Sequence, residues 1–125
     1  MNKHYSIREA AERTGVTAHT LRYYEQIGLL KPIQRTSSGY RCYTDDDLGW
    51  VDFLTCLRAT GMSIQGMLQF VRLAHTGEHT VPTRCDLLED HRDALHQRIR
   101  ELQEYLSVID AKITTYRTLT QQRLD

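Results

Sequence analysis

The fold of this chain is decided by one stretch at residues 17–25, which reads Thr17-Ala18-His19-Thr20-Leu21-Arg22-Tyr23-Tyr24-Glu25. Thr17 is a favourable N-cap, because its hydroxyl oxygen can accept a hydrogen bond from a backbone N–H of the first turn. Gly28 stands where a left-handed residue commonly follows the end of a helix. The stretch therefore predicts a short helix over 18–27.

A second helix is predicted immediately before this stretch. Ser6-Ile7-Arg8-Glu9 has the pattern of a capping box. Apolar residues then recur at Ile7, Ala10 and Ala11, which predicts a helix over 6–13. The intervening Thr14-Gly15-Val16 contains a glycine that tolerates positive φ. Two short helices joined by such a turn are typical of a helix-turn-helix motif.

The sequence changes character after this motif. Pro32 cannot continue a helix, and Thr36-Ser37-Ser38-Gly39 is a cluster of turn-forming residues. Residues 33–35 and 40–43 flank the cluster and have the composition of short strands. We expect a small β-hairpin here, called the wing, with its tip at 36–39.

Two more helices and a linker are expected next. Thr44 precedes three aspartates, which suit the N-terminal end of a helix that runs to about Thr60. Ser63 can cap a further helix that runs to about Ala74. The polar stretch that follows predicts three parts: a head with its linking helices at 1–75, a linker at 76–82 and a C-terminal helix at 83–125.

The C-terminal segment has the most regular apolar pattern. Its apolar positions alternate steps of four and three residues between Leu95 and Tyr116, which predicts a coiled-coil seam. A helix of about 40 residues is about 60 Å long, too long to bury this stripe on the head, so it needs a partner helix. The alternative is a break near Tyr105 that folds the segment back on itself, although nothing there disfavours a helix. The expected seam is Leu88, Leu95, Ile99, Leu102, Leu106, Ile109, Ile113 and Tyr116.

Composition limits the class of protein further. The chain has 125 residues, of which 40% are hydrophobic, and this fits one ordinary folded protein. No apolar run approaches the ~20 residues of a membrane span, and the N-terminus lacks an apolar signal core, so we expect a cytoplasmic protein. The net charge is zero, but residues 1–43 hold seven basic and three acidic residues and the rest hold nine and thirteen. A basic front half fits a head that binds phosphates.

These motifs, in this order and spacing, resemble the MerR family of bacterial regulators. The resemblance implies a mainly α protein with a winged helix-turn-helix, linking helices and a long C-terminal helix that pairs antiparallel in a homodimer. It also implies a DNA-binding regulator rather than an enzyme, without a cofactor, that distorts a promoter spacer on double-stranded DNA for RNA polymerase. The matching residues are Thr14-Gly15-Val16, Leu21–Glu25, Gly28-Leu29-Leu30, Arg35, Gly39–Tyr43, Asp47-Leu48 and Gly61–Ile64.

The start of the second helix and the wing are expected to contact DNA. Helix-turn-helix proteins place the N-terminal turn of this helix in the major groove. The planar guanidinium of Arg22 suits both phosphate and guanine. One of Tyr23 and Tyr24 is expected in the core, and Tyr40 has packing of the wing as its alternative role. The candidate DNA-contacting residues are Thr17, Ala18, His19, Arg22, Tyr24, Arg35, Tyr40, Arg41 and Tyr43.

Three cysteines bear on what the protein senses. Metal-sensing members of the family carry a cysteine near the start of the long helix and a cysteine loop after it, and only Cys85 matches. One thiolate cannot complete a soft-metal site, so no metal site is expected. The run at 53–62 resembles the small thiol-based branch (NmlR/AdhR-like) that responds to aldehydes or nitrosative stress. In that branch the cysteine at the Cys56 position is the proposed sensor of a reactive small molecule, and an inert packed thiol is the alternative. Cys42 is expected to be structural or incidental.

Two other functions stay open at this stage. One is a metal-responsive regulator of the same family, and the other is a coiled-coil adaptor whose head binds protein. An enzyme is not expected, because no cysteine clusters by sequence with a histidine and an acid, and no glycine-rich phosphate loop is present.

Overall fold

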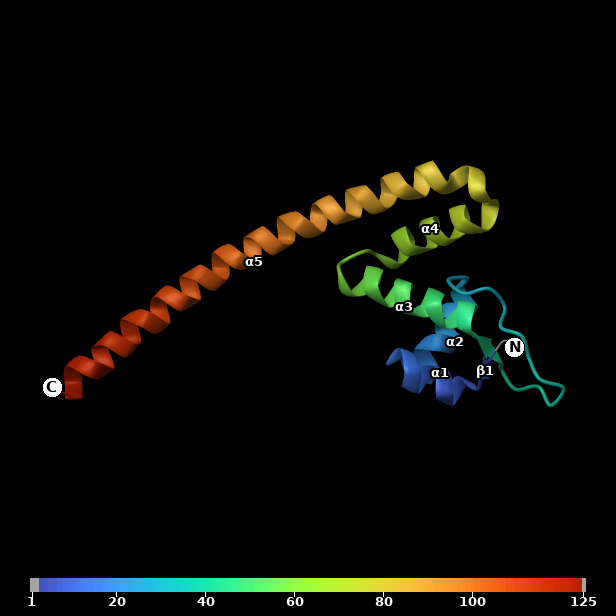
Figure 1. Ribbon diagram of the computed structural model, residues 1–125, viewed down its shortest axis with the longest axis horizontal. Helices are drawn as coiled ribbons and strands as arrows, with labels where there is room; N and C mark the ends of the chain where they lie inside the picture. The colour runs from blue at the N-terminus through green and yellow to red at the C-terminus, as the bar shows by residue number, and fades with distance from the viewer. Residues whose placement is uncertain (1–2, 125) are drawn as a thin grey trace. The chain divides into compact units, whose positions relative to one another are not determined.

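The computed structural model describes residues 3–124 and is mainly helical (Figure 1). Two compact units divide the chain, with the first ending at Cys85 and the second beginning at Asp86. This confirms the predicted class, a winged helix-turn-helix head followed by a long C-terminal helix. The elements are β1 (His4–Tyr5), α1 (Ile7–Thr14), α2 (Ala18–Ile27), β2 (Tyr43–Thr44), α3 (Asp45–Ala59), α4 (Ile64–Thr76), the 3₁₀ turn η1 (Glu78–Thr80) and α5 (Val81–Leu124).

The helices of the helix-turn-helix begin at the predicted caps. Ser6 and Glu9 form a reciprocal capping box at α1, in which the Glu9 N–H donates to Ser6 Oγ at 3.1 Å. Thr17 Oγ1 accepts from the backbone N–H of Thr20 at 3.1 Å and so starts α2. Gly28 ends α2 with φ of 90°, which a side-chain-bearing residue rarely adopts. The sequence therefore predicted both helices to within one residue.

The next two helices also start at side-chain caps. Thr44 and Asp47 form a second capping box, and the Asp47 N–H donates to Thr44 Oγ1 at 3.1 Å. Ser63 Oγ accepts from the Gly66 N–H at 3.0 Å at the start of α4. These caps satisfy donors that the first turn of a helix otherwise leaves unpaired.

The expected linker at 76–82 is largely helical. α4 continues to Thr76, the chain is interrupted only at Gly77, and η1 then leads directly into α5. Pro82 reads as a helix breaker in the sequence, but it lies in the first turn of α5. A first-turn proline costs little, because its missing N–H has no intrahelical acceptor.

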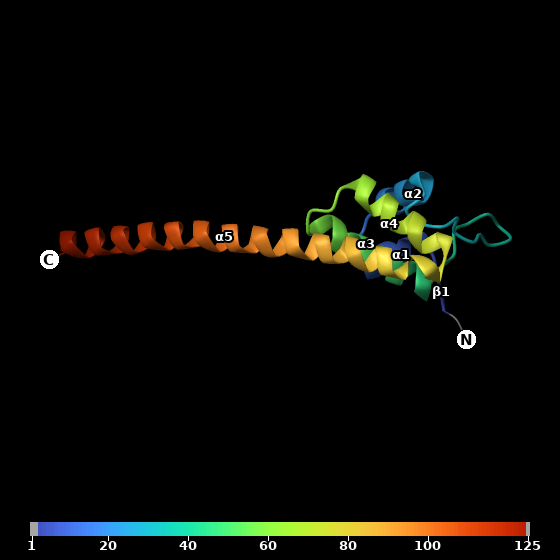
Figure 2. The ribbon, with the colours of Figure 1, turned by 90° about the horizontal axis from the view of Figure 1, so that it is seen from above.

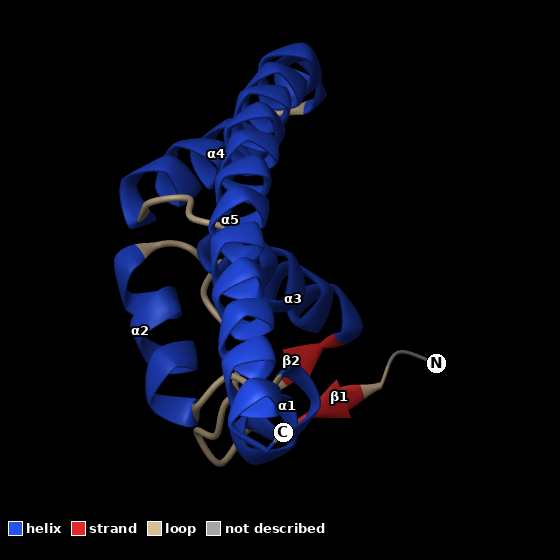
Figure 3. Ribbon diagram, turned by 90° about the vertical axis from the view of Figure 1, so that its left-hand side faces the viewer, coloured by secondary structure: helices blue, strands red, loops and turns tan. Residues whose placement is uncertain are grey.

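The sheet differs from the expected hairpin. β1 pairs antiparallel with β2, and Tyr5 lies opposite Tyr43 (Figure 3). The wing is a loop closed by one isolated bridge between Arg35 and Arg41. It extends away from the helices of the head (Figure 2). The wing is therefore present, but its ladder is shorter than predicted because Tyr43 pairs with the N-terminal strand.

The core of the head is formed by residues from every helix of the first unit and from the segment after α2. Val51 and Leu54 are fully buried on α3, at the three-residue spacing of one helix face. Ile27, at the end of α2, is only half-buried. The buried apolar residues of the described chain are Tyr5, Ala10, Leu21, Tyr24, Leu29, Leu30, Ile33, Tyr43, Leu48, Val51, Leu54, Leu57, Met67, Phe70 and Val71.

α5 is one continuous helix of 44 residues. It has no break at Tyr105, which excludes the fold-back alternative. The predicted seam is largely exposed in the single chain: Leu102, Leu106 and Ile109 are 50%, 55% and 56% exposed. None of the helices between residues 3 and 124 combines the length and apolarity that crossing a membrane requires.

Candidate nucleic-acid interface

α2 has one buried face and one exposed face. Leu21 is fully buried and Tyr24 is 7% exposed. Side chains three or four positions apart share a helix face, and the opposite face carries four exposed residues. These are His19, Arg22, Tyr23 and Gln26.

The first turn of α2 divides the predicted contacts into two kinds. Thr17 is exposed, but its hydroxyl serves as the helix cap and also donates to Thr20 Oγ1 at 2.9 Å. Ala18 is half-buried. His19 and Arg22 are exposed, and the structure records no hydrogen bond from either side chain to another residue in 3–124. Arg22 and His19 are therefore the residues of the predicted set on α2 whose side chains remain available for DNA.

Two predicted contacts belong to the core instead. Tyr24 packs beneath α2, which agrees with the expectation that one of the two adjacent tyrosines is buried. Tyr43 is fully buried, and its hydroxyl has no hydrogen-bond partner among the described residues. Burial also raises the pKa of the Tyr43 hydroxyl. Both side chains therefore belong to the core of the head, and neither Tyr24, at 7% exposed, nor the fully buried Tyr43 is a candidate DNA contact.

Tyr23 is the candidate that sequence reasoning missed. It is 44% exposed and follows Arg22 directly on the open face of α2. Its ring lies 6.4 Å from that of Tyr24. The signal was available, since Tyr24 lies three positions after the apolar Leu21 and Tyr23 lies only two. A tyrosine hydroxyl at this place can donate to a phosphate.

The wing presents an arginine and a tyrosine on either side of its tip. Arg35 is exposed and donates from Nη1 to the Gly39 carbonyl at 2.8 Å. Gly39 closes the turn with φ of 88°, and Thr36 donates its N–H to the Tyr40 carbonyl at 2.7 Å. Tyr40 is 74% exposed, so it does not merely pack the wing. The wing therefore holds Arg35 in a fixed geometry and leaves the Tyr40 ring open.

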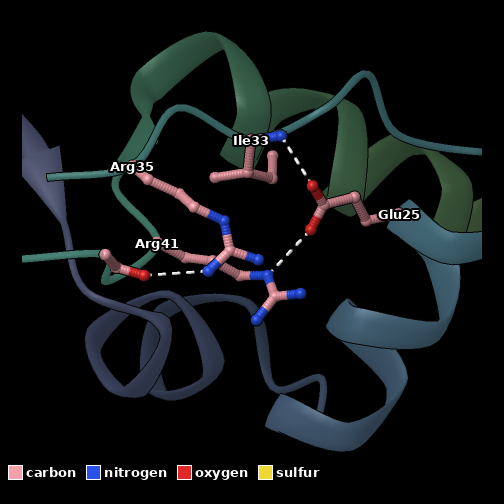
Figure 4. A network of polar contacts seen from close by, with 5 residues as sticks. Glu25, Ile33, Arg35 and Arg41 are labelled. Carbon is pink, nitrogen blue, oxygen red and sulfur yellow. Dashed lines mark hydrogen bonds and ion pairs between the residues drawn. The ribbon is translucent and has the colours of Figure 1, made fainter.

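A carboxylate that the sequence did not single out ties the wing to α2. Glu25 accepts from the Ile33 N–H and from Arg41 Nε, both at 2.8 Å (Figure 4). The Glu25 and Arg41 side chains are only 16% and 23% exposed. Arg41 was predicted as a DNA contact, and the structure gives its Nε a positioning role. These contacts connect the end of α2 to both sides of the wing.

The same contacts set the protonation of Glu25. Burial by itself raises the pKa of Glu25, but the hydrogen bonds from Arg41 and Ile33 outweigh it and hold the pKa below its ordinary value of 4.5. A carboxyl whose pKa is lower in the folded state stabilises the fold above the unfolded pKa. That stabilisation is lost as the pH falls through the folded pKa.

Replacing Glu25 with glutamine is expected to lower the free energy of unfolding by about 1–3 kcal/mol at pH 7. The amide can accept at one oxygen only, so either the Ile33 N–H or Arg41 loses its acceptor. Urea unfolding at pH 7 and below pH 4.5 measures the effect. The difference between the two proteins should shrink on the acid side, where wild-type Glu25 is itself protonated.

Glu12→Gln is the matched control for this substitution. Glu12 pairs with Arg8 at 3.6 Å, and the two side chains are 70% and 89% exposed. Its loss should change stability by less than about 0.5 kcal/mol. Equal effects of the two substitutions, or a Glu25→Gln effect that is independent of pH, would remove the proposed role of the Glu25 carboxylate.

The cysteines differ in accessibility. Cys56 is exposed on α3, Cys85 is exposed in the first turns of α5, and Cys42 is half-buried in the wing. Within residues 3–124 no group of three or more His, Cys, Asp or Glu side chains is placed to hold a metal ion. Cys56 is therefore accessible to a small reagent rather than packed in the core.

Comparison with known proteins identifies the family. Residues 5–72 match the model of the MerR HTH family regulatory proteins. The chain is 40% identical over 90 residues to the transcriptional regulator AdhR of Bacillus subtilis, a match that spans 72% of this chain and 64% of AdhR.

Solved structures agree with this match. HiNmlR, described as a MerR family regulator lacking the sensor domain and bound to promoter DNA, is 36% identical with a TM-score of 0.86, over 92% of this chain and 87% of that one. A MerR family regulator from Listeria monocytogenes is 43% identical with a TM-score of 0.84, over 90% and 85% of the two chains. The exposed α2 face, the wing and the long α5 thus belong to one known architecture, and the chain is a member of the MerR family of helix-turn-helix transcriptional regulators.

Proposed function

We propose that this regulator binds a pseudo-palindromic site in a promoter spacer as a homodimer and activates transcription by RNA polymerase through distortion of that DNA. The observation that carries the proposal is the joint surface of α2 and the wing, where Arg22, Tyr23, Arg35 and Tyr40 are exposed. Its similarity to HiNmlR, which is bound to promoter DNA, supports the same use of this surface.

The surface suits backbone contacts combined with limited base readout. Arginine and tyrosine donate to phosphate oxygens, and such contacts fix register on the duplex. His19 and Arg22 lie at the N-terminal part of α2, which enters the major groove in helix-turn-helix proteins. We assign phosphate contacts to Arg35 and Tyr40, and base or phosphate contacts to Arg22 and His19.

The exposed seam of α5 supports the dimer. A soluble helix does not normally leave a continuous stripe of Ile99, Leu102, Leu106, Ile109 and Ile113 exposed to water. In this proposal residues 1–75 read DNA, residues 83–125 dimerise, and 76–82 join them. The charges of α5 favour an antiparallel pair, because the acidic stretch 86–93 would then lie beside the basic stretch 112–123.

We further propose that Cys56 senses a reactive electrophile. Its thiol is exposed on α3, and the chain is similar to AdhR and HiNmlR. A thiolate that adds to an aldehyde forms a carbon–sulfur bond, while the carbonyl oxygen takes up a proton. The adduct would enlarge a side chain on the helix that follows the wing, a local change of the kind that switches use.

Cys56→Ser tests the sensor, with Cys42→Ser and Cys85→Ser as matched controls. Promoter activation by formaldehyde or a dicarbonyl should fall to the basal level in Cys56→Ser, while operator affinity stays within about twofold of wild type. Both control variants should keep the response, and mass spectrometry should place the adduct on Cys56. A full response in Cys56→Ser would show that the sensor lies elsewhere.

A further inference from the structure

The order of residues in the seam of α5 also indicates how the two helices of a dimer are aligned. Its apolar residues form two series, one with Ile99, Leu106 and Ile113, and one with Leu95, Leu102 and Ile109. In an antiparallel coiled coil each layer pairs one series with the other. We infer that α5 pairs in a single register. In this register the two-fold axis lies at the level of Glu104, midway between Leu102 and Leu106. This inference rests on the proposed antiparallel dimer and specifies its geometry.

In this register every central layer is apolar. Leu102 packs against the partner's Leu106, and the remaining layers join Ile99 with the partner's Ile109 and Leu95 with the partner's Ile113. The seam is then continuous from Leu95 to Ile113, in the stretch where Ile99 to Ile113 are exposed in the single chain. The alternative registers move the two-fold axis along α5 by half a heptad. Such a half-heptad shift toward the N-terminus would place Arg92 against the partner's Ile109.

Arg92 lies seven residues before Ile99 and therefore occupies a seam position itself. Its surroundings differ between the inferred register, the shifted registers and a parallel pair. In the inferred register it meets the partner's Tyr116, so that its aliphatic stem packs on the ring and its guanidinium lies over the ring face. A half-heptad shift toward the C-terminus places Arg92 against the partner's Arg123. A parallel pair places the two copies of Arg92 against each other in the seam, whereas the antiparallel pair separates them by about 36 Å.

The charges that flank the seam point to the same register. Glu89 lies beside the partner's Arg117, and His96 lies beside the partner's Asp110. The N-terminal half-heptad shift would place Glu89 beside the partner's Asp110, which repels it. One unfavourable pair remains, between Arg98 and the partner's Lys112, and at the solvent edge such a pair costs little.

The flanking charges belong to two longer stretches of α5, one mainly acidic and one basic. Asp86, Glu89, Asp90 and Asp93 surround the single Arg92 in residues 86–93, whereas Lys112, Arg117 and Arg123 are the charged residues of 112–123. An antiparallel register centred beside Glu104 superimposes these two stretches. A register centred elsewhere leaves part of one stretch without its counterpart.

Single-cysteine crosslinking tests the register, because Gln103 lies next to the axis and meets its own copy. In the full chain with Cys42, Cys56 and Cys85 changed to serine, Gln103→Cys should form a disulfide-linked dimer on mild oxidation. Glu89→Cys should not, because its two copies lie about 40 Å apart. A mixture of Glu89→Cys and Arg117→Cys should yield the mixed disulfide dimer.

The outcomes separate the register from the proposed function. Self-crosslinking by Arg92→Cys, whose two copies face each other only in a parallel pair, would show that arrangement, and failure of Gln103→Cys in a chain that still dimerises and binds operator would show another register. A cysteine-free chain that is monomeric by sedimentation would overturn the dimer and the register together.

A charge exchange gives an independent readout. Glu89→Arg and Arg117→Glu should each weaken dimerisation by about three- to tenfold, and the double variant should recover most of the loss. Losses that simply add would contradict the pairing of these two positions.

Discussion

Replacing Leu106 with glutamate will convert the protein from a dimer into a monomer. Leu106 lies at the centre of the exposed seam, and it is 55% exposed in the single chain. A partner helix would bury one unpaired carboxylate per subunit, and each costs several kcal/mol. The dimer dissociation constant should therefore rise by at least about a thousandfold. Sedimentation velocity over a range of concentrations measures this directly.

The same substitution should reduce operator binding, although residue 106 lies outside the DNA-reading head. Two linked heads bind two half-sites with an effective concentration in the millimolar range, and a monomer loses this gain. We expect operator affinity to fall by about 10²- to 10⁴-fold.

Ser107→Glu is the matched control, because it introduces the same residue at the next position, which lies outside the seam. It should remain a dimer and bind operator as the wild type does. A dimeric Leu106→Glu protein with wild-type affinity would show that α5 does not form the interface.

Replacing Arg22 with alanine is the second large effect. Arg22 is exposed on the open face of α2 beside Tyr23. Each charge-assisted contact to DNA is worth about 1–3 kcal/mol, and the dimer loses two. Operator affinity should fall by at least about thirtyfold, and the slope of log affinity against log salt should become shallower by about one for each phosphate contact removed. Fluorescence anisotropy at several salt concentrations measures both quantities.

Two further variants separate the effect of charge from that of the guanidinium geometry at Arg22. Arg100→Ala removes the same charge from the exposed surface of α5 and should leave operator affinity within about twofold of wild type. Arg22→Lys keeps the charge but not the planar fork, so it should retain most non-specific binding and lose any guanine readout. An unchanged affinity and salt slope in Arg22→Ala would remove Arg22 from the interface.

The sequence predicted those parts of the fold that depend on local chemistry. Ser6, Thr17, Thr44 and Ser63 each start a helix because a hydroxyl can reach an N–H two or three positions ahead. The length and continuity of α5 follow similarly from its seam and from the lack of helix breakers after Pro82. Such features need only neighbouring residues.

Contacts between distant segments were not predictable in the same way. β1 contains only His4 and Tyr5, too few residues to show a strand pattern, and it pairs with a residue far away in the sequence, since Tyr5 lies opposite Tyr43. Tyr5 is further held by its hydroxyl, which donates to Asp45 at 2.9 Å. The shortened wing ladder results from this pairing.

The same distinction between local and long-range contacts explains why only part of the candidate site was predicted. Arg22, Arg35 and Tyr40 are exposed as expected, because charge and turn position largely decide their exposure. Tyr43 follows the wing in the sequence, yet pairing with Tyr5 turns it into the core. Glu25 went unnoticed because its partners, Ile33 and Arg41, lie beyond Gly28 and come close only in the folded head.

In the proposed function, two copies of the α2 and wing surface read DNA as a symmetric pair. Hydroxyl-radical footprinting of the region upstream of the protein's own gene, with and without an aldehyde, tests this arrangement. We predict protection in two half-sites related by two-fold symmetry on one face of the duplex, with altered cleavage between them when the aldehyde is present. Protection of a single half-site, or none above non-specific binding, would contradict the account.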